Sequence, residues 1–357
     1  MTDWINFPAA ATGAGRAASA PDRAGVANWL WFVAALVFAM VVVGGATRLT
    51  ESGLSITEWK PVTGVIPPLS HADWVAAFEK YKQIPQYKEL FPDMDLARFQ
   101  TIFLWEWSHR LLGRLIGFVF ALGLAWFWPR GALTSRLKWQ LSGVLALGAL
   151  QGAVGWWMVA SGLVNRVEVA QERLAIHLLL ASLTFAALVW IAGGLRAPRR
   201  LEDASTTARV FAVLLALATL KQIFLGALVA GLRAGLTYNT WPLMDGRFMP
   251  PVEQLFKNDP WWMNFFDNIT TVQFDHRMAA YAVLALALLN AIFARQTGVA
   301  RRGWAIVALV LCQVGLGIAT LLYSVPLPLA LAHQALAMVV LGMVTANLRA
   351  AFPAHAG

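Results

Sequence analysis

Long runs of apolar residues, separated by shorter polar stretches, dominate this chain. Several runs approach the ~20 residues that an α-helix needs to cross a bilayer. Eight such segments are expected, with bounds good to about 2–4 residues, at 28–46, 105–128, 137–160, 172–195, 208–231, 274–294, 303–323 and 330–348. The pattern predicts an all-α integral membrane protein with eight transmembrane helices.

The polar signals between these segments occur twice, in the same order. The matching positions are Gly53 and Gly235, Trp59 and Trp241, His109 and His276, Gln151 and Gln313, and His177 and His333. Each repeat contains four crossings, so both halves point the same way, unlike the inverted repeats of many transporters. The sequence therefore predicts two tandem, same-orientation four-helix bundles, at 28–200 and 201–349.

The net charge of +9 over 357 residues raises the question of a nucleic-acid partner. The basic residues cluster, however, in alternate loops: Arg130, Arg136 and Lys138; Arg196, Arg199, Arg200 and Arg209; Arg295, Arg301 and Arg302. By the positive-inside rule these loops and both termini face the cytoplasm of a bacterial inner membrane. Residues 1–27, which lack the pattern of a signal peptide, are predicted to be a disordered cytoplasmic tail, and 350–357 a second tail. The charge indicates topology, not nucleic-acid binding.

Four histidines lie near the starts of the second, fourth, sixth and eighth segments: His109, His177, His276 and His333. All four segments start at the outer face, which puts the histidines in one layer close to the periplasm. A single intramembrane histidine is often only a hydrogen-bonded interhelical residue. Two symmetric pairs favour two haem irons, each with two axial imidazoles. Zinc is disfavoured because too few sulfur or carboxylate partners accompany them.

Glu106 marks a difference between the halves. It lies three residues before His109, so a helix places both side chains on one face. Gln273 takes the same place before His276. An amide can form similar hydrogen bonds without acid–base chemistry, whereas a carboxylate near hydrocarbon is costly. A structural ion pair with a nearby arginine is one reading; the preferred one is a reaction in the first half and a held cofactor in the second.

Five further residues are candidates for contact with haem propionates or the haem pocket: Arg48, Arg110, Arg277, Gln151 and Gln313. Arginine suits planar carboxylates, but it can equally snorkel or hold a loop. The glutamines precede glycines that permit close helix approach, so helix packing explains them at least as well. The sequence leaves these alternatives open.

Other positions carry weaker signals. His71 in the first outer loop and His355 in the tail are expected to be solvated. Lys221, near the middle of the fifth segment, is expected to face the bundle interior or a water-filled cavity. The single cysteine, Cys312, excludes an intramolecular disulfide.

The two long outer loops, 47–104 and 232–273, are rich in aromatic residues. The first loop has a pattern suited to a short interfacial helix, carried by Trp74, Phe78, Tyr81, Tyr87 and Phe91. The second contains Trp261, Trp262, Phe265 and Phe266, which fit an aromatic belt. Both loops are expected to cover the histidine layer.

The most specific stretch runs from Arg48 to Pro68 and reads RLTESGLSITEWKPVTGVIPP. Together with WEWSHR at 105–110, QGAVGWWMVASG at 151–162 and DHR at 275–277, it resembles the haem A synthase family in its alphaproteobacterial and mitochondrial form. The resemblance covers 28–349. It implies eight helices in two similar bundles.

The resemblance also implies an activity: oxidation of the C8 methyl group of haem O to a formyl group, by two hydroxylations and loss of water, giving haem A for terminal oxidases. It implies that His109 and His177 bind the substrate haem O, that His276 and His333 bind a haem b cofactor, and that Glu106 is the essential acidic residue. Haem O synthase and oxidase assembly factors are the implied partners.

Two points qualify this expectation. Many bacterial members carry paired cysteines in the outer loops, and this chain has none there, so its electrons must arrive by another route. A dihaem electron-transfer cytochrome is the alternative function. It explains the histidines equally well, but neither the Glu106/Gln273 difference nor the first-loop motif.

Overall fold

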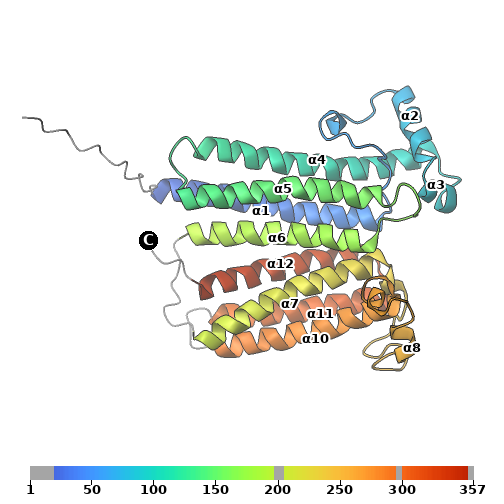
Figure 1. Cartoon of the computed structure of the whole chain (residues 1–357). Coiled ribbons are helices and arrows are strands. Elements are labelled where there is room, and N and C mark those ends of the chain that lie inside the picture. The colour runs from blue at the N-terminus through green and yellow to red at the C-terminus, as the bar shows by residue number, and fades with distance from the viewer. Residues whose placement is uncertain (1–19, 197–204, 295–299, 353–357) are drawn as a thin grey trace, which may run out of the picture.

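The computed structural model describes residues 20–196, 205–294 and 300–352. Within these ranges, eight helices are long and apolar enough to cross a membrane. They lie side by side (Figure 1) and comprise α1 (Ala20–Leu49), α4 (Leu96–Phe127), α5 (Ser135–Ala160), α6 (Gln171–Leu195), α7 (Thr206–Gly231), α10 (Ile269–Ala294), α11 (Ala300–Leu322) and α12 (Leu327–Ala351). The predicted all-α membrane protein with eight crossings is confirmed.

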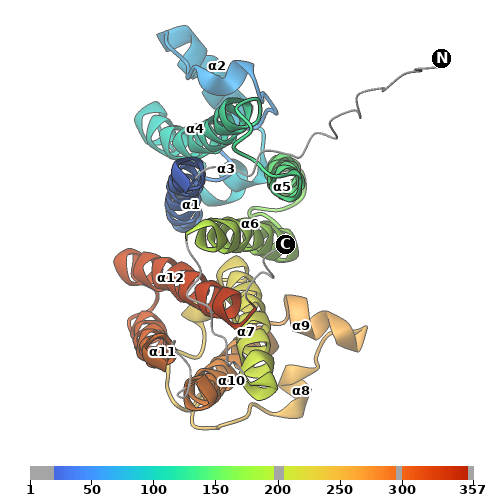
Figure 2. The same cartoon turned by 90° about the vertical axis from the view of Figure 1, so that its left-hand side faces the viewer.

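The long helices pack as two sets of four, seen nearly end-on in Figure 2. In the first set, α1 and α5 each contact both α4 and α6. In the second set, α7 and α11 each contact both α10 and α12. The same arrangement of neighbours therefore occurs in both halves of the chain.

The two sets meet through α6, which packs on α7 and α12, and through α1, which packs on α12. Leu188 of α6 and Leu341 of α12 are buried in one shared apolar cluster with Leu30 of α1. Gln334 of α12 donates from Nε2 to the carbonyl of Val41 on α1, at 2.7 Å. Since lipid offers no hydrophobic driving force between helices, such close packing and interhelical hydrogen bonds hold the halves together.

Both long connections lie at the same end of the helices (Figure 1). Between α1 and α4 the chain forms η1 (Thr63–Val65), α2 (His71–Tyr81) and α3 (Pro85–Leu90). Between α7 and α10 it forms η2 (Ala234–Leu236), α8 (Val252–Leu255), η3 (Trp261–Met263) and α9 (Asn264–Asp267). A shared end is what an even number of crossings per half requires.

Helix α2 forms the short helix expected in the first loop. Ser70 caps it, accepting from the Asp73 amide at 3.1 Å while Asp73 accepts from the Ser70 amide, a reciprocal capping box. His71 is the first residue of this helix and is exposed, as expected for a solvated residue of the first loop. Lys80 binds Glu58 at 2.8 Å, and hydrogen bonds from Lys80 and Lys60 lower the pKa of Glu58.

Helix α4 begins at Leu96, well before the predicted start at residue 105. The Asp95 side chain accepts from the Arg98 amide at 2.8 Å and caps the helix there. The extra turns carry Phe99, which stacks on Phe78 of α2 at a centroid distance of 4.9 Å. Hydropathy located only the apolar part of α4, so the predicted start was wrong.

The first and last helices extend into residues that were predicted to be tails. Helix α1 already includes residues 20–27, and Val26 and Ala27 are fully buried. Helix α12 continues to Ala351, which is also buried. The remaining tail residues, the boundary between 200 and 201, and Arg199, Arg200, Arg295 and His355 lie outside the described residues.

Candidate functional site

The four histidines project into the two helix sets from opposite sides. His109 on α4 lies against α1, and His177 on α6 lies against α5. The two histidines of each pair, His109 with His177 and His276 with His333, lie on helices that share the same two neighbours within their set. His177, His276 and His333 lie about two turns into their helices, as expected, whereas His109 lies in the fourth turn of the longer α4.

Each histidine ring rests on a glycine of a neighbouring helix. A Cβ atom at Gly155 would come within 2.9 Å of His177 Cε1, and one at Gly317 within 2.8 Å of His333 Cε1. Gly226 gives 3.1 Å to His276 Cε1, and Gly44 gives 3.0 Å to His109 Nε2. The absence of side chains at these four glycines therefore makes room for the four rings.

Three histidines also have a glutamine partner. Gln151 Nε2 donates to the carbonyl of His177 at 3.1 Å, and Gln313 Nε2 donates to the carbonyl of His333 at 3.0 Å. Each of these amide nitrogens also lies 3.4 Å from the ring Nε2 of the same histidine. Both glutamines, predicted as pocket or packing residues, thus contact the candidate ligands.

Gln222 of α7 is a contact that the sequence analysis missed. Its Nε2 lies 3.1 Å from His276 Nδ1 and donates to the His276 carbonyl at 3.0 Å. The signal was present: Gln222 precedes Gly226 by one turn, as Gln151 precedes Gly155. A single glutamine in an apolar helix is commonly a helix-packing residue, so the sequence alone did not distinguish Gln222 as a functional one.

Glu106 is buried, and its carboxylate receives four hydrogen bonds. Oε2 accepts from Ser55 Oγ at 2.7 Å and from the Ile56 amide at 2.8 Å. Oε1 accepts from Arg110 Nη2 at 2.6 Å and from its Nε at 3.1 Å. Arg110 continues to the carbonyls of Ile56 and Glu58. Glu106 and Arg110 together anchor the first outer loop beside His109.

The matching residues of the second half hold the second loop with the opposite polarity. Gln273 Nε2 donates to the carbonyls of Ala234 and Thr237, both at 2.7 Å. Arg277 donates to Gln273 Oε1 at 3.2 Å and to the carbonyl of Tyr238 at 2.8 Å. Glu106 accepts from a backbone amide of its loop, whereas Gln273 donates to two backbone carbonyls of its loop, so the acid–amide difference matches the backbone groups that each loop presents.

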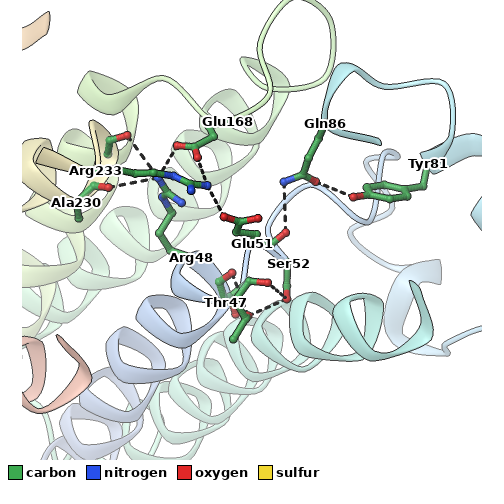
Figure 3. Close-up of polar contacts among 11 residues, drawn as sticks. Thr47, Arg48, Glu51, Ser52, Tyr81, Gln86, Glu168, Ala230 and Arg233 are labelled. Atoms are coloured by element: carbon green, nitrogen blue, oxygen red, sulfur yellow. Dashed lines mark hydrogen bonds and ion pairs between the residues drawn. The ribbon is translucent and has the colours of Figure 1, made fainter. Parts of the chain in front are cut away.

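Arg48 belongs to a cluster of charges between the two halves, drawn in Figure 3. Its Nη2 lies 2.6 Å from Glu168 Oε2. Arg233 pairs with both Glu168 and Glu51. Burial lowers the pKa of Arg233, but the carboxylates of Glu168 and Glu51 outweigh burial and raise that pKa above its ordinary value. The cluster joins the end of α1, the α5–α6 connection and the turn after α7.

Lys221 does not lie in the bundle interior. Its side chain is exposed and interacts electrostatically with Asp275, which is half-buried on α10. Of the two expected surroundings, the bundle interior does not hold, because Gln222 takes that position on α7 and contacts His276; a water-filled cavity stays a prediction.

The site residues fit a haem group in each half. The donor set is two imidazoles from facing helices, the arrangement that bis-histidine haem ligation needs. Nδ1 of His177 and Nδ1 of His333 are buried without a hydrogen-bond partner among the described residues, and so are the Oε1 atoms of Gln151, Gln222 and Gln313. Unpaired buried polar atoms are costly, and a haem-bound histidine whose ring N–H meets a glutamine oxygen would satisfy them.

Comparison with known proteins agrees with this geometry. A family model described as "COX15-CtaA: Cytochrome oxidase assembly protein" matches residues 27–345. A protein of Beijerinckia indica named "Heme A synthase" is 60% identical over 331 residues, covering 91% of this chain and 92% of its own. A Rhodopseudomonas palustris (strain BisA53) protein of the same name is 58% identical, covering 95% and 94%. One from Brucella ovis is 54% identical, covering 94% of each chain.

The matched region spans nearly all of the described residues, including both histidine pairs and both outer loops. The family expected from the first-loop and histidine motifs is therefore confirmed. The chain belongs to the COX15-CtaA family of cytochrome oxidase assembly proteins.

Proposed function

We propose that this protein is a haem A synthase, a membrane oxidoreductase that converts the C8 methyl group of haem O into a formyl group by successive hydroxylations. The observation that carries the proposal is the 60% identity, over more than nine tenths of both chains, to a protein named for that activity. The product, haem A, is used by terminal oxidases. A dihaem electron-transfer cytochrome is not favoured, because the relatives are named as synthases.

Haem O binds in the first half, with His109 and His177 as its axial ligands. The rings are seated on Gly44 and Gly155, which supports a fixed porphyrin position relative to α4. Holding the methyl carbon in one place supplies much of the selectivity of the oxidation. The first loop is tied to α4 through Glu106 and Arg110, next to the proposed ligand His109.

A haem b cofactor binds in the second half, between His276 and His333. When bound, it supplies an iron that can exchange electrons. Gln222 and Gln313 orient the two rings. Arg277 holds the second loop through the carbonyl of Tyr238. Arg48 and Arg110 are likewise engaged, in an ion pair with Glu168 and in a loop contact with Ile56, so binding of haem propionates is a second proposed role for these three arginines.

Glu106 is the proposed catalytic residue. It is 2% exposed and lies one helical turn from His109, with no acidic counterpart in the second half. The Glu106 carboxylate has one of two roles: it stabilises positive charge that develops on the substrate, or it relays a proton from the substrate. The proposed location is a bacterial inner membrane, with cytoplasmic termini, the histidine layer near the periplasmic face, and haem O synthase as a neighbour.

The test is production of the protein in a host that makes haem O but no haem A, followed by chromatographic identification of the extracted haems. Wild-type protein should yield haem A together with haem b. Glu106→Gln should retain haem b and accumulate haem O, with haem A reduced at least about 100-fold, within the range for loss of an acid–base group. Haem A formation at the wild-type rate by this variant would exclude the catalytic role.

Ser55→Ala is the matched control, because it removes one hydrogen bond to Glu106 and loosens the loop without touching the carboxylate. It should keep most of the activity. Equal losses in Glu106→Gln and Ser55→Ala would instead assign Glu106 to loop anchoring alone.

A further inference from the structure

Three histidines of this protein face a neighbouring helix that carries glutamine and glycine one turn apart. The glycine admits the imidazole, and the glutamine contacts the same histidine. The pairs are Gln151 and Gly155 on α5, Gln222 and Gly226 on α7, and Gln313 and Gly317 on α11. Recurrence on three different helices indicates a common device for holding a histidine.

The fourth histidine, His109, lacks the glutamine. Its glycine is Gly44 of α1, which precedes Gly53 by the same interval as Gly226 precedes Gly235. One turn before Gly44, where α7 has Gln222, α1 has Met40. The Met40 methyl group lies 3.1 Å from a Cβ atom built at Gly113, next to α4. A thioether donates no hydrogen bond and accepts only weakly, so this contact cannot replace the amide.

The ring of His109 is also turned differently. Its Nε2 atom faces Gly44, whereas the other three rings turn Cε1 toward their glycines. Gln222, by contrast, contacts both the ring and the carbonyl of His276. In the second half, both candidate ligands therefore contact a glutamine. In the first half, His177 contacts a glutamine and His109 does not, among the described residues.

A glutamine beside a haem-ligating histidine changes how well the iron is bound. Its oxygen can accept a hydrogen bond from the ring N–H, which fixes the ring and raises its basicity. The Oε1 atom of Gln222 is buried without a partner among the described residues, so rotation of the amide makes it available to Nδ1 of His276. Loss of such a partner typically weakens metal binding about 10–100-fold.

We propose that Gln222 and Met40 set the different haem retention of the two sites: Gln222 makes the second-half site retain its haem, and Met40 leaves the first-half site open to exchange. The inference rests on the proposed function, in which the first site must admit a substrate haem and release a product. Gln222 is a positioning residue, because it acts through His276.

The experiment measures transfer of haem from the purified full-length protein to excess apomyoglobin, and the reduction potential of the haem b. Gln222→Met should release haem b about 10-fold faster than wild type and shift its potential upward, because a less basic imidazole stabilises ferric iron less. Gln222→Glu keeps an acceptor, so it should restore retention and shift the potential downward. Lys221→Arg, at the neighbouring position of α7, keeps the positive charge near Asp275; it is the control and should change neither.

The reciprocal change is Met40→Gln, with Met40→Leu as its control. Met40→Gln should slow release of the first-half haem about 10-fold, so that haem A remains on the purified protein, while Met40→Leu behaves as wild type. This pair also decides the matter if Gln222→Met fails to fold.

The outcomes separate the two claims. Wild-type protein that contains no haem b and forms no haem A would overturn the proposed function. Haem A formation by the wild type, with unchanged haem release in both Gln222→Met and Met40→Gln, would overturn this inference and leave the function standing.

Discussion

A methyl group added at Gly317 would meet His333 Cε1 at 2.8 Å, closer than non-bonded carbon atoms approach. Gly317→Ala must therefore push the imidazole from its seat or spread α11 from α12. We expect an overpacking cost of about 1–3 kcal/mol and loss of most haem from the second half. The haem-to-protein ratio of the purified variant, measured by absorbance, tests this expectation.

Gly315→Ala is the matched control on the same helix. A Cβ atom at Gly315 meets nothing within 4 Å, and alanine is favoured over glycine in a helix by about 0.8–1 kcal/mol. This variant should bind haem normally and be at least as stable as wild type. Equal haem contents in the two variants would show that the glycine at 317 is not needed to seat the ring.

The candidate ligands were predictable because histidines are rare in predominantly apolar segments, and His109, His177, His276 and His333 recur in register. Gln222 lacked that contrast. Its partner, His276, lies on another helix, and hydropathy carries no information on which face of α7 turns toward α10. The exposed position of Lys221 has the same cause, since adjacent residues on a helix point about 100° apart.

At the scale of elements, the loop anchors of the two halves make opposite demands on one side-chain position. Gln273 donates to two backbone carbonyls and is 3% exposed. Gln273→Glu removes both donors and turns a carboxylate toward those carbonyls, with only Arg277 to compensate. We expect a destabilisation of about 1–3 kcal/mol, the cost of leaving buried polar groups unsatisfied.

Thermal unfolding and trypsin cleavage at the exposed Arg247 and Lys257 in the second loop should report this change. Gln254→Glu makes the same charge change at an exposed position of that loop and serves as the control. If both variants resist trypsin as well as wild type, Gln273 does not anchor the loop.

Helix ends were harder to predict than helices. Hydropathy reports which residues match the lipid interior, whereas α4 begins where Asp95 caps it and where Phe99 packs on Phe78. Neither contact depends on the membrane. The opposite error occurs at residues 20–27, which precede the first predicted apolar segment and were assigned to a tail, although Val26 and Ala27 are buried by tertiary packing.

At the scale of the whole molecule, Glu168 links the halves because it pairs with both Arg48 and Arg233. The side chains of Arg48 and Glu168 are only 18% and 20% exposed, so water screens their attraction less than that of a surface pair. Arg233, at 39% exposure, contributes less. Glu168→Gln leaves two neighbouring guanidinium groups with one carboxylate, Glu51, between them.

We expect Glu168→Gln to lower the free energy of unfolding by about 1–3 kcal/mol, between the values for exposed and fully buried pairs. Glu79→Gln, which breaks the solvent-exposed pair with Lys82, should leave the free energy of unfolding almost unchanged. Adding Arg48→Met to Glu168→Gln removes the uncompensated charge, so the double variant should be more stable than Glu168→Gln alone. Thermal unfolding of the wild type, these three variants and Arg48→Met alone gives this comparison. Strictly additive losses would show that the charges do not act as one cluster, and the contact between the halves would then depend on the apolar packing of α6 and α12.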